Sequence, residues 1–360
     1  MIVTDAWFPQ TNGVVNTISQ TAAWLLRFGH DVRIVSPGEY RTLPCPTYPE
    51  IRLAVGARRA LGQRFEDFQP EAVHIATEGP LGLGARRHCR RRGLRFTTSY
   101  HTQFPEYLAS RAPIPLRASY AAQRWFHSGG YRCMVSTQSI RATLSARGFK
   151  NLASWQRGVD TDLFRPRGKD FLQIPRPIAA YVGRLAVEKN VEAFLQMRWQ
   201  GSKIVIGDGP RRARLQSQFP EARFTGFRYG EDLAAHLAAA DVMVFPSLTD
   251  TFGLVNLEAM ACGVPVAAFP VPGPLDVVED GRTGALDTDL ARAAERALLI
   301  DPNACRARAL SSTWETCTRQ FESNLVCCQP GAPTPTLPSR SDSTNCQSKH
   351  RMRIEDDWHA

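Results

Sequence analysis

Short apolar segments alternate with helical segments along most of the chain, and this pattern runs through twice. Strands joined by helices form parallel sheets, because a parallel crossover needs a connection of helical length. At 360 residues the chain exceeds the roughly 250 residues at which a single hydrophobic core stops growing. We therefore predict an α/β protein with two Rossmann-like domains. Strands are expected near Ile2 and at residues 32–35, 72–75, 96–99 and 133–136, then at 178–182, 203–206, 223–225, 242–245 and 265–268.

Composition indicates where these units end. Residues 166–177 are rich in proline, glycine and charge, which is typical of a linker. We predict a first domain at 1–165 and a second at 166–310. A helix is expected within 311–328, because Trp314, Cys317 and Phe321 recur on one helical face. Residues 329–360 are mostly polar with added proline, and we expect this tail to be disordered.

Two carboxylates, Asp250 and Glu258, stand eight positions apart around a Phe-Gly turn. The apolar strand before them ends at Pro246, and a helix-spaced apolar pattern follows them. Asp250 is thus expected on the loop at the carboxyl end of a strand, with Glu258 about two turns along the next helix. Gly253 lets backbone approach a ligand closely, and N–H groups at a helix start form an anion site. The alternative is an ordinary strand, loop and helix with solvated acids.

Three further segments carry candidate site residues at predicted strand ends. Asn12 and Gly13 precede a helix and can present backbone N–H groups to a phosphate. Arg184 and Lys189 lie five positions apart on a loop after the strand at 178–182, where they can neutralise a diphosphate. His101 follows the apolar-aromatic strand at 96–99. A turn, a solvated charged loop and a structural histidine are the respective alternatives.

In this order the motifs resemble those of the retaining glycosyltransferases of family 4, which have the GT-B fold. The acidic residue and glutamate at Asp250 and Glu258 match its signature, and Gly-Arg-Leu-Ala-Val-Glu-Lys-Asn at 183–190 matches G-R-L-x-x-E-K-N. The resemblance covers roughly residues 1–326. The chain departs from the family's usual residues at Arg157, where asparagine is usual, and at Asp250, where glutamate is usual.

The resemblance implies a role for each site residue. Glu258 would hold the ribose hydroxyls of a nucleotide sugar, and Asp250 and His101 would face the transferred sugar. The diphosphate would be clamped by Arg184, Lys189, the loop at Asn12 and Gly13, and the donor-binding segment of Phe252, Gly253, Leu254 and Val255. The fold would place the donor in a cleft between the domains, with the last helix crossing back to the first domain.

The resemblance also implies the substrates. The sequence Thr-Asp-Thr-Phe-Gly at 249–253 resembles bacterial mannosyltransferases, which makes GDP-mannose the expected donor. The acceptor would be a hydroxyl group on a lipid, a glycan or a small molecule. No cofactor or metal is expected, because two cations already face the phosphates. The D-x-D pairs at 160–162 and 287–289 lie at the predicted hinge and on a turn.

Charge is concentrated in the first half. The net charge is +10, and residues 1–150 carry 20 Lys and Arg against 9 Asp and Glu, a difference of +11. The densest run occupies 86–95, beginning at Arg86 and ending at Arg95. Such a run can bind anionic lipid headgroups, or it can be a solvated helix end. Nucleic acid is not an expected partner, because no nucleic-acid-binding motif or interleaved aromatic pattern accompanies the run.

The remaining features favour the cytoplasm. The nine cysteines are scattered without zinc spacing, the first residues lack a signal peptide's basic region, and no apolar run of about 18 residues occurs. We expect a cytoplasmic protein, with peripheral binding to the inner face of the cytoplasmic membrane if the basic run contacts lipid.

Three other functions were weighed. An NAD-dependent oxidoreductase needs G-x-G-x-x-G after a strand, and the glycines at 79, 82 and 84 have the wrong order. A sugar-nucleotide epimerase or hydrolase shares the fold, but its catalytic acids find no match beyond His101. An inactive or weakly active relative that binds nucleotide sugar stays open, because the first strand is short and the polar tail looks appended.

Overall fold

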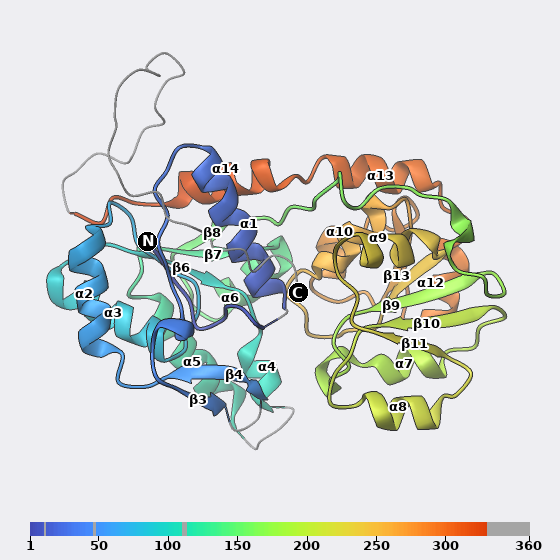
Figure 1. Cartoon of the computed structure of the whole chain (residues 1–360), viewed down its shortest axis with the longest axis horizontal. Coiled ribbons are helices and arrows are strands. Elements are labelled where there is room, and N and C mark those ends of the chain that lie inside the picture. The colour runs from blue at the N-terminus through green and yellow to red at the C-terminus, as the bar shows by residue number, and fades with distance from the viewer. Residues whose placement is uncertain (11, 46–47, 110–113, 330–360) are drawn as a thin grey trace, which may run out of the picture.

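Two six-stranded parallel sheets, each flanked by helices, stand next to each other in the computed structural model (Figure 1). It describes residues 1–10, 12–45, 48–109 and 114–329. Apart from Gln329, the tail that we expect to be disordered lies outside the described residues. Because parallel sheets need cover on both faces, two layered α/β units are the arrangement that the alternating pattern predicted.

The first sheet has the order β2-β1-β5-β6-β7-β8. All its pairings are parallel, and residues such as Thr98 and Cys133 lie opposite each other in register. An antiparallel hairpin, which the sequence pattern did not predict, is inserted before β5. The strands are β1 Ile2–Val3, β2 Ile34–Val35, β5 His74–Ile75, β6 Thr97–Tyr100, β7 Arg132–Val135 and β8 Leu152–Ser154, and the hairpin is β3 Thr42–Cys45 and β4 Tyr48–Ala54.

The second sheet has the order β11-β10-β9-β12-β13-β14, and it is also parallel throughout. The direction of winding reverses between β9 and β12. In open α/β sheets ligands bind in the crevice outside the carboxyl ends of the strands at this reversal. The strands are β9 Ile178–Val182, β10 Ser202–Ile206, β11 Arg223–Gly226, β12 Val242–Phe245, β13 Val266–Ala268 and β14 Gly284–Leu286.

Helices connect the strands of each sheet. Those of the first half are α1 Gly13–Arg27, α2 Arg58–Phe68, α3 Pro80–Arg92, α4 Phe104–Ala109, α5 Leu116–His127 and α6 Gln138–Ala146. Those of the second half are α7 Val191–Gln196, α8 Arg212–Gln218, α9 Gly230–Ala239, α10 Leu254–Ala261, α11 Pro274–Val277, α12 Leu290–Ala297 and α13 Pro302–Leu310. Short 3-10 turns are η1 Pro37–Glu39, η2 Lys169–Phe171 and η3 Val187–Lys189, and α14 Trp314–Asn324 is the last described helix.

Both faces of the second sheet are buried, which explains why its strands are continuous apolar runs. Alternate residues of β9 enter different cores: Ile178 and Ala180 lie in one, and Ala179 and Tyr181 lie in the other. The strand therefore contributes side chains to a hydrophobic layer above and below the sheet.

The last helix returns to the first sheet, as predicted. On α14, Trp314 and Phe321 pack in one buried cluster with Ile2, Ile18 and Trp155, and in Figure 1 α14 lies beside α1 over the first unit. The chain thus passes between the two units twice. The two passages lie side by side, since the backbone N–H of Val159 donates to the carbonyl of Ser312 at 2.9 Å.

Candidate active site

The start of α10 is shaped by a glycine in the left-handed conformation. Gly253 has φ +77°, and a Cβ at this position would lie 2.7 Å from Phe245 Cζ and 2.7 Å from Asn256 Nδ2. Only glycine fits both the backbone angle and the space. The loop after β12 turns at Gly253 into α10, whose first N–H groups are those of Leu254 and Val255. The first N–H groups of a helix have no partner within it and are suited to an anion.

Lys189 and Asp250 meet although they lie 61 positions apart. Lys189 follows β9 and Asp250 follows β12, the two strands that flank the winding reversal. Lys189 Nζ donates to both carboxylate oxygens of Asp250, at 2.6 and 2.9 Å. Burial is the largest single influence and lowers the pKa of Lys189, but the charge of Asp250, the charge of Tyr107 and the hydrogen bond to Asp250 together raise the net pKa. The ammonium is therefore a fixed positive charge at the site.

Arg184 is held by a neighbouring carboxylate on the same loop. Its Nη2 donates to Glu188 Oε1 at 2.6 Å, and the side chain of Glu188 is only 3% exposed. The Tyr181 hydroxyl donates to the Arg184 carbonyl at 2.9 Å, which fixes the backbone of the loop. Both sequence-predicted cations are thus oriented by carboxylates.

Glu258 carries a half-buried carboxyl group on the second turn of α10. Burial raises its pKa to about 7. Among the residues that the structure describes, no hydrogen-bond donor or ion-pair partner contacts its carboxylate. A carboxylate removed from water gains by accepting hydrogen bonds from a ligand, because its own desolvation is otherwise uncompensated.

The first half supplies the opposite wall. Asn12 caps α1, and its Oδ1 accepts from the backbone N–H groups of Val14 and Val15, at 3.0 Å each. A Cβ built on Gly13 would lie 3.5 Å from Leu254 Cδ1. The start of α1 therefore lies next to the start of α10, which brings together the two helix ends that were expected from the sequence to face a phosphate.

His101 lies at the same boundary, at the end of β6. Its carbonyl oxygen accepts from Thr251 Oγ1 at 2.8 Å, which links it to the residue after Asp250. Its ring bonds to Ser99 Oγ at 3.0 Å and to Arg157 Nη2 at 3.2 Å. Burial, followed by the charge of Arg157, holds the pKa of His101 well below its usual value, so the ring is neutral.

Several residues that sequence reasoning missed close this boundary. Gln103 Nε2 donates to the carbonyls of Thr249 and Asp250, at 3.1 and 3.4 Å. The hydroxyl of Ser136, after β7, donates to the carbonyl of Thr251 at 3.1 Å. The only sequence signal for Gln103 and Ser136 was that each follows the end of a strand in the first sheet. Their hydrogen-bond partners lie in the second half of the chain, and no local sequence pattern reveals such distant contacts.

The acids of both D-x-D pairs accept hydrogen bonds within the protein. Asp160 Oδ1 accepts from the backbone N–H groups of residues 162 and 163, and Asp289 caps α12. Asp287 accepts hydrogen bonds chiefly from Arg292, which holds its pKa well below the usual range. Over the described ranges, no group of three or more His, Cys, Asp or Glu side chains could hold a metal ion.

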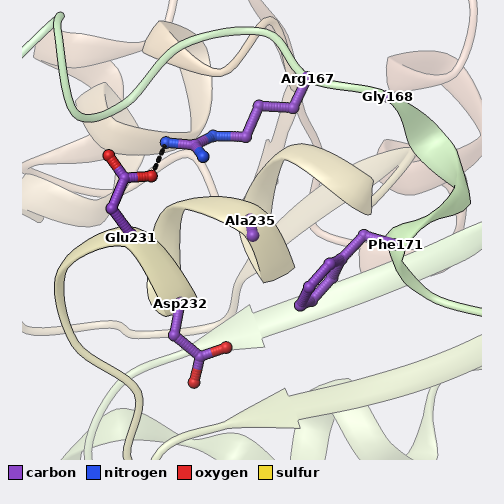
Figure 2. Close-up of a pocket in the computed structure, with 6 residues that line it drawn as sticks. All are labelled: Arg167, Gly168, Phe171, Glu231, Asp232 and Ala235. Atoms are coloured by element: carbon purple, nitrogen blue, oxygen red, sulfur yellow. Dashed lines mark ion pairs between the residues drawn. The ribbon is translucent and has the colours of Figure 1, made fainter.

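Figure 2 shows a hollow that lies elsewhere. It is formed between the linker and α9, where Arg167 pairs with Glu231 at 2.5 Å and Phe171 stands opposite Ala235 and Asp232. It contains none of the sequence-predicted site residues. The pairing of Arg167 and Glu231 ties the linker to the second unit.

The basic run on α3 divides into buried and exposed arginines. Arg86 is 5% exposed: it donates to the carbonyls of Phe126 and Trp125 and stacks on the Trp125 ring at 3.9 Å. Arg95 donates to the Gln329 carbonyl. The exposed arginines are Arg87, Arg90, Arg91 and Arg92, three of which line a groove between α2 and α3 with Arg59 and His88.

Family models match both halves. The model described as Glycosyltransferase Family 4 matches residues 11–163, and that described as Glycosyl transferases group 1 matches residues 176–300. A GDP-mannose-dependent alpha-mannosyltransferase of Mycobacterium tuberculosis is 34% identical over 312 residues, which cover 79% of this chain and 82% of that protein. The chain belongs to glycosyltransferase family 4. The predicted family is thereby confirmed.

Among other relatives of this glycosyltransferase, one has the same name and another names a different sugar. The GDP-mannose-dependent alpha-mannosyltransferase of Mycolicibacterium smegmatis is also 34% identical, over 79% of this chain and 83% of its own. The sulfoquinovosyl transferase of Arabidopsis thaliana is 28% identical, over 79% of this chain and 62% of its own. Family membership thus fixes the transferase class, whereas the sugar varies among relatives.

Solved structures confirm the GT-B fold of the glycosyltransferase. Sucrose-phosphate synthase from Thermosynechococcus elongatus has a TM-score of 0.69 at 20% identity, over 89% of this chain and 96% of that one. Anabaena HepE, solved with UDP and glucose, has a TM-score of 0.67 at 16% identity, over 89% and 97%. None of the helices within the described residues has the length and apolar character needed to cross a bilayer.

Proposed function

We propose that this enzyme is a retaining glycosyltransferase that moves mannose from GDP-mannose to a hydroxyl group of an acceptor. The observation that carries the proposal is the Lys189–Asp250 ion pair at the start of α10. A charged lysine and a carboxylate near the first N–H groups of α10 support the binding of a diphosphate and a sugar there. Two relatives at 34% identity whose names specify GDP-mannose support this donor.

Each site residue has one role in this proposal. Glu258 accepts hydrogen bonds from the ribose hydroxyls, which satisfies its otherwise unpartnered carboxylate. The N–H groups of Leu254 and Val255, with Arg184 and Lys189, bind the diphosphate. Phe252 and Gly253 shape that loop, and Asn12 and Gly13 close it from the first half. Each Asp250 oxygen keeps a lone pair for sugar hydroxyls besides the one that Lys189 engages, and His101 lies beside the sugar.

The chemistry rests on fixed positive charge. As the bond between the anomeric carbon and the diphosphate oxygen breaks, negative charge grows on the leaving group. Preoriented cations and N–H donors stabilise that charge more than they stabilise the bound donor, and this difference lowers the barrier. Because Lys189 and Arg184 supply the charge, we propose that transfer needs no metal ion and no cofactor.

The acceptor is proposed to bind on the first half, as a hydroxyl of a lipid, a glycan or a small molecule. The exposed arginines of α3 and the groove that they line would suit the headgroups of an anionic membrane. A cytoplasmic enzyme that binds the inner membrane surface peripherally fits this charge pattern. Arg86 is buried and Arg95 donates to the Gln329 carbonyl, so we propose that the exposed arginines within residues 87–92 make this contact, although Arg92 also pairs with Glu66 at 3.1 Å.

The proposal is tested with purified full-length enzyme. It is incubated with GDP-mannose or UDP-glucose, with and without EDTA, and release of the nucleoside diphosphate is measured. We expect slow hydrolysis of GDP-mannose that EDTA does not reduce, and release of an α-configured sugar, which NMR of the anomeric proton identifies. Binding without turnover would favour an inactive relative, while conversion to an isomeric sugar nucleotide would favour an epimerase.

A further inference from the structure

A continuous chain of hydrogen bonds runs from Arg157 through His101 into the core of the first sheet. Arg157 Nη2 lies 3.2 Å from His101 Nδ1, and His101 Nε2 lies 3.0 Å from Ser99 Oγ. Ser99 Oγ then lies 2.8 Å from His74 Nε2, and His74 Nδ1 lies 2.9 Å from Thr97 Oγ1. Thr97 Oγ1 lies 3.4 Å from the Val73 carbonyl oxygen, which ends the chain with an acceptor.

The donor at the head of the chain fixes where every proton lies. A guanidinium group has only donors, so His101 Nδ1 must accept and its proton sits on Nε2. That proton is donated to Ser99 Oγ, whose single proton then goes to His74 Nε2. His74 consequently carries its proton on Nδ1 and donates to Thr97, which donates to the Val73 carbonyl. One cation thus determines the tautomer of two buried histidines.

Arg157 is itself held rigidly. Its Nη1 donates to the carbonyls of Trp155 and Gln156, at 2.6 and 3.1 Å, and its guanidinium lies 4.4 Å from the centre of the Trp155 ring. The residue is 4% exposed. Burial lowers its pKa to about 10, so it remains charged at neutral pH. Its donors are therefore fixed in direction and in charge.

We propose that Arg157 is a positioning residue that locks His101 as the neutral tautomer protonated on Nε2. The inference rests on the proposed function, in which His101 lies beside the transferred sugar. Because Arg157 and Ser99 engage both ring nitrogens, His101 contacts the sugar without taking a proton from it. The ring serves as a neutral wall of fixed orientation, and it does not act as a general base.

The tautomer is measured directly on the donor-free protein. Full-length enzyme with ¹⁵N-labelled histidine is examined by long-range ¹H–¹⁵N correlation NMR, and His101→Gln identifies the His101 signals. We expect a deprotonated Nδ1 and a protonated Nε2 in the wild type. A proton on Nδ1, or an equal mixture of the two tautomers, would overturn the proposal whether or not any variant folds.

Two variants test Arg157 as the cause. In Arg157→Gln the side-chain amide can accept as well as donate, so we expect both tautomers of His101. In Arg157→Lys the side chain is again only a donor, so we expect the single wild-type tautomer. Circular dichroism and thermal melting establish that both variants fold. A wild-type tautomer in folded Arg157→Gln would show that Arg157 does not set it.

Kinetics connect the tautomer to transfer. We expect kcat to fall about tenfold in Arg157→Gln, with the KM for GDP-mannose within about twofold, because orientation is lost while the donor contacts remain. Arg157→Lys should recover most of kcat. A changed tautomer with unchanged kcat would overturn the positioning role. Wild-type enzyme with the expected tautomer but no turnover would instead count against the proposed function alone.

Discussion

The carboxyl group of Glu258, at the proposed donor site, titrates near neutral pH. Its pKa of about 7 means that the carboxyl group gains a proton as the pH falls through neutrality. Ribose hydroxyls donate to the charged form, so binding favours the carboxylate. We expect the Kd for GDP-mannose to rise as the pH falls from 8 to 6, by at most about tenfold per unit below the pKa. Calorimetric titration at several pH values measures this.

The matched control replaces the carboxyl group with an amide of the same shape. Glu258→Gln should bind the donor more weakly at pH 8 and lose the pH dependence between 8 and 6. Glu258→Ala should also weaken donor binding. Unchanged affinity in either variant would contradict the ribose assignment, and a pH dependence that persists in Glu258→Gln would place the titrating group elsewhere.

Lys189 should affect the chemical step more than donor binding. Its ammonium faces charge that grows only as the diphosphate leaves, and loss of such a group costs about 10²–10³ in rate. We therefore expect Lys189→Ala to lower kcat by that factor, measured as nucleoside diphosphate release at saturating donor. Lys150→Ala, at an exposed lysine of the first half, serves as the charge-matched control and should retain wild-type kcat.

At the scale of elements, a substitution at the start of α10 can test whether the backbone conformation of Gly253 positions the proposed diphosphate site. Gly253→Ala forces a Cβ into left-handed backbone and against Phe245 and Asn256. We expect a loss of about 1–3 kcal/mol in unfolding free energy and weaker donor binding. Gly281 has nearly the same angle, φ +78°, but open space around it. Gly281→Ala should destabilise comparably or less and leave donor affinity unchanged, as denaturant unfolding and calorimetry would show.

The sequence pattern predicts buried elements better than edges. The strand expected at 178–182 coincides with β9, because both of its faces are buried and the apolar run is unbroken. The sequence pattern did not predict β8 or β14, which are edge strands of the first and second sheets. Each has three residues, and the side chains of β8 are only half-buried, so no apolar run marks it. Helix α13 was missed as well, since only Cys305 and Ala309 are buried and no apolar face repeats.

The site was predictable in its residue types but not in its contacts. The carboxyl ends of neighbouring parallel strands meet, so Lys189 and Asp250 could be expected to lie near each other. The bond between His101 and Thr251 spans 150 positions and joins two sheets. Arg157 stood out only as a departure from the family pattern. Its effect on His101 depends on the path of the chain after β8, which local sequence does not encode.

At the scale of the whole molecule, the basic surface lies far from the proposed donor site. In Figure 1, α2 and α3 occupy the end of the first unit that is remote from the second sheet. We expect the enzyme to sediment with vesicles containing anionic lipid and not with neutral vesicles. The attraction should fade as salt rises, because exposed charges are screened within about 8 Å at physiological ionic strength.

Replacing arginines tests whether vesicle binding depends on the exposed arginines of α3 or only on the net charge of the protein. Changing Arg90, Arg91 and Arg92 to Gln should abolish most vesicle binding while donor hydrolysis is retained. The control changes three exposed arginines of the second half, Arg198, Arg214 and Arg223, and should leave vesicle binding intact. Equal sedimentation with neutral vesicles, or no effect of the α3 changes, would show that the basic run at residues 86–95 is a solvated helix end and does not bind membranes.

The return of α14 to the first sheet has a consequence for synthesis on the ribosome. The N-terminal half emerges first, yet the cluster around Ile2 and Ile18 is completed by Trp314 and Phe321. These residues are translated roughly 300 positions later, and nascent chains grow at about 5–20 residues per second. Apolar surface on the first unit therefore stays uncovered while the whole second unit is made. A chaperone that binds nascent chains would find its site there, over the face that α14 finally covers.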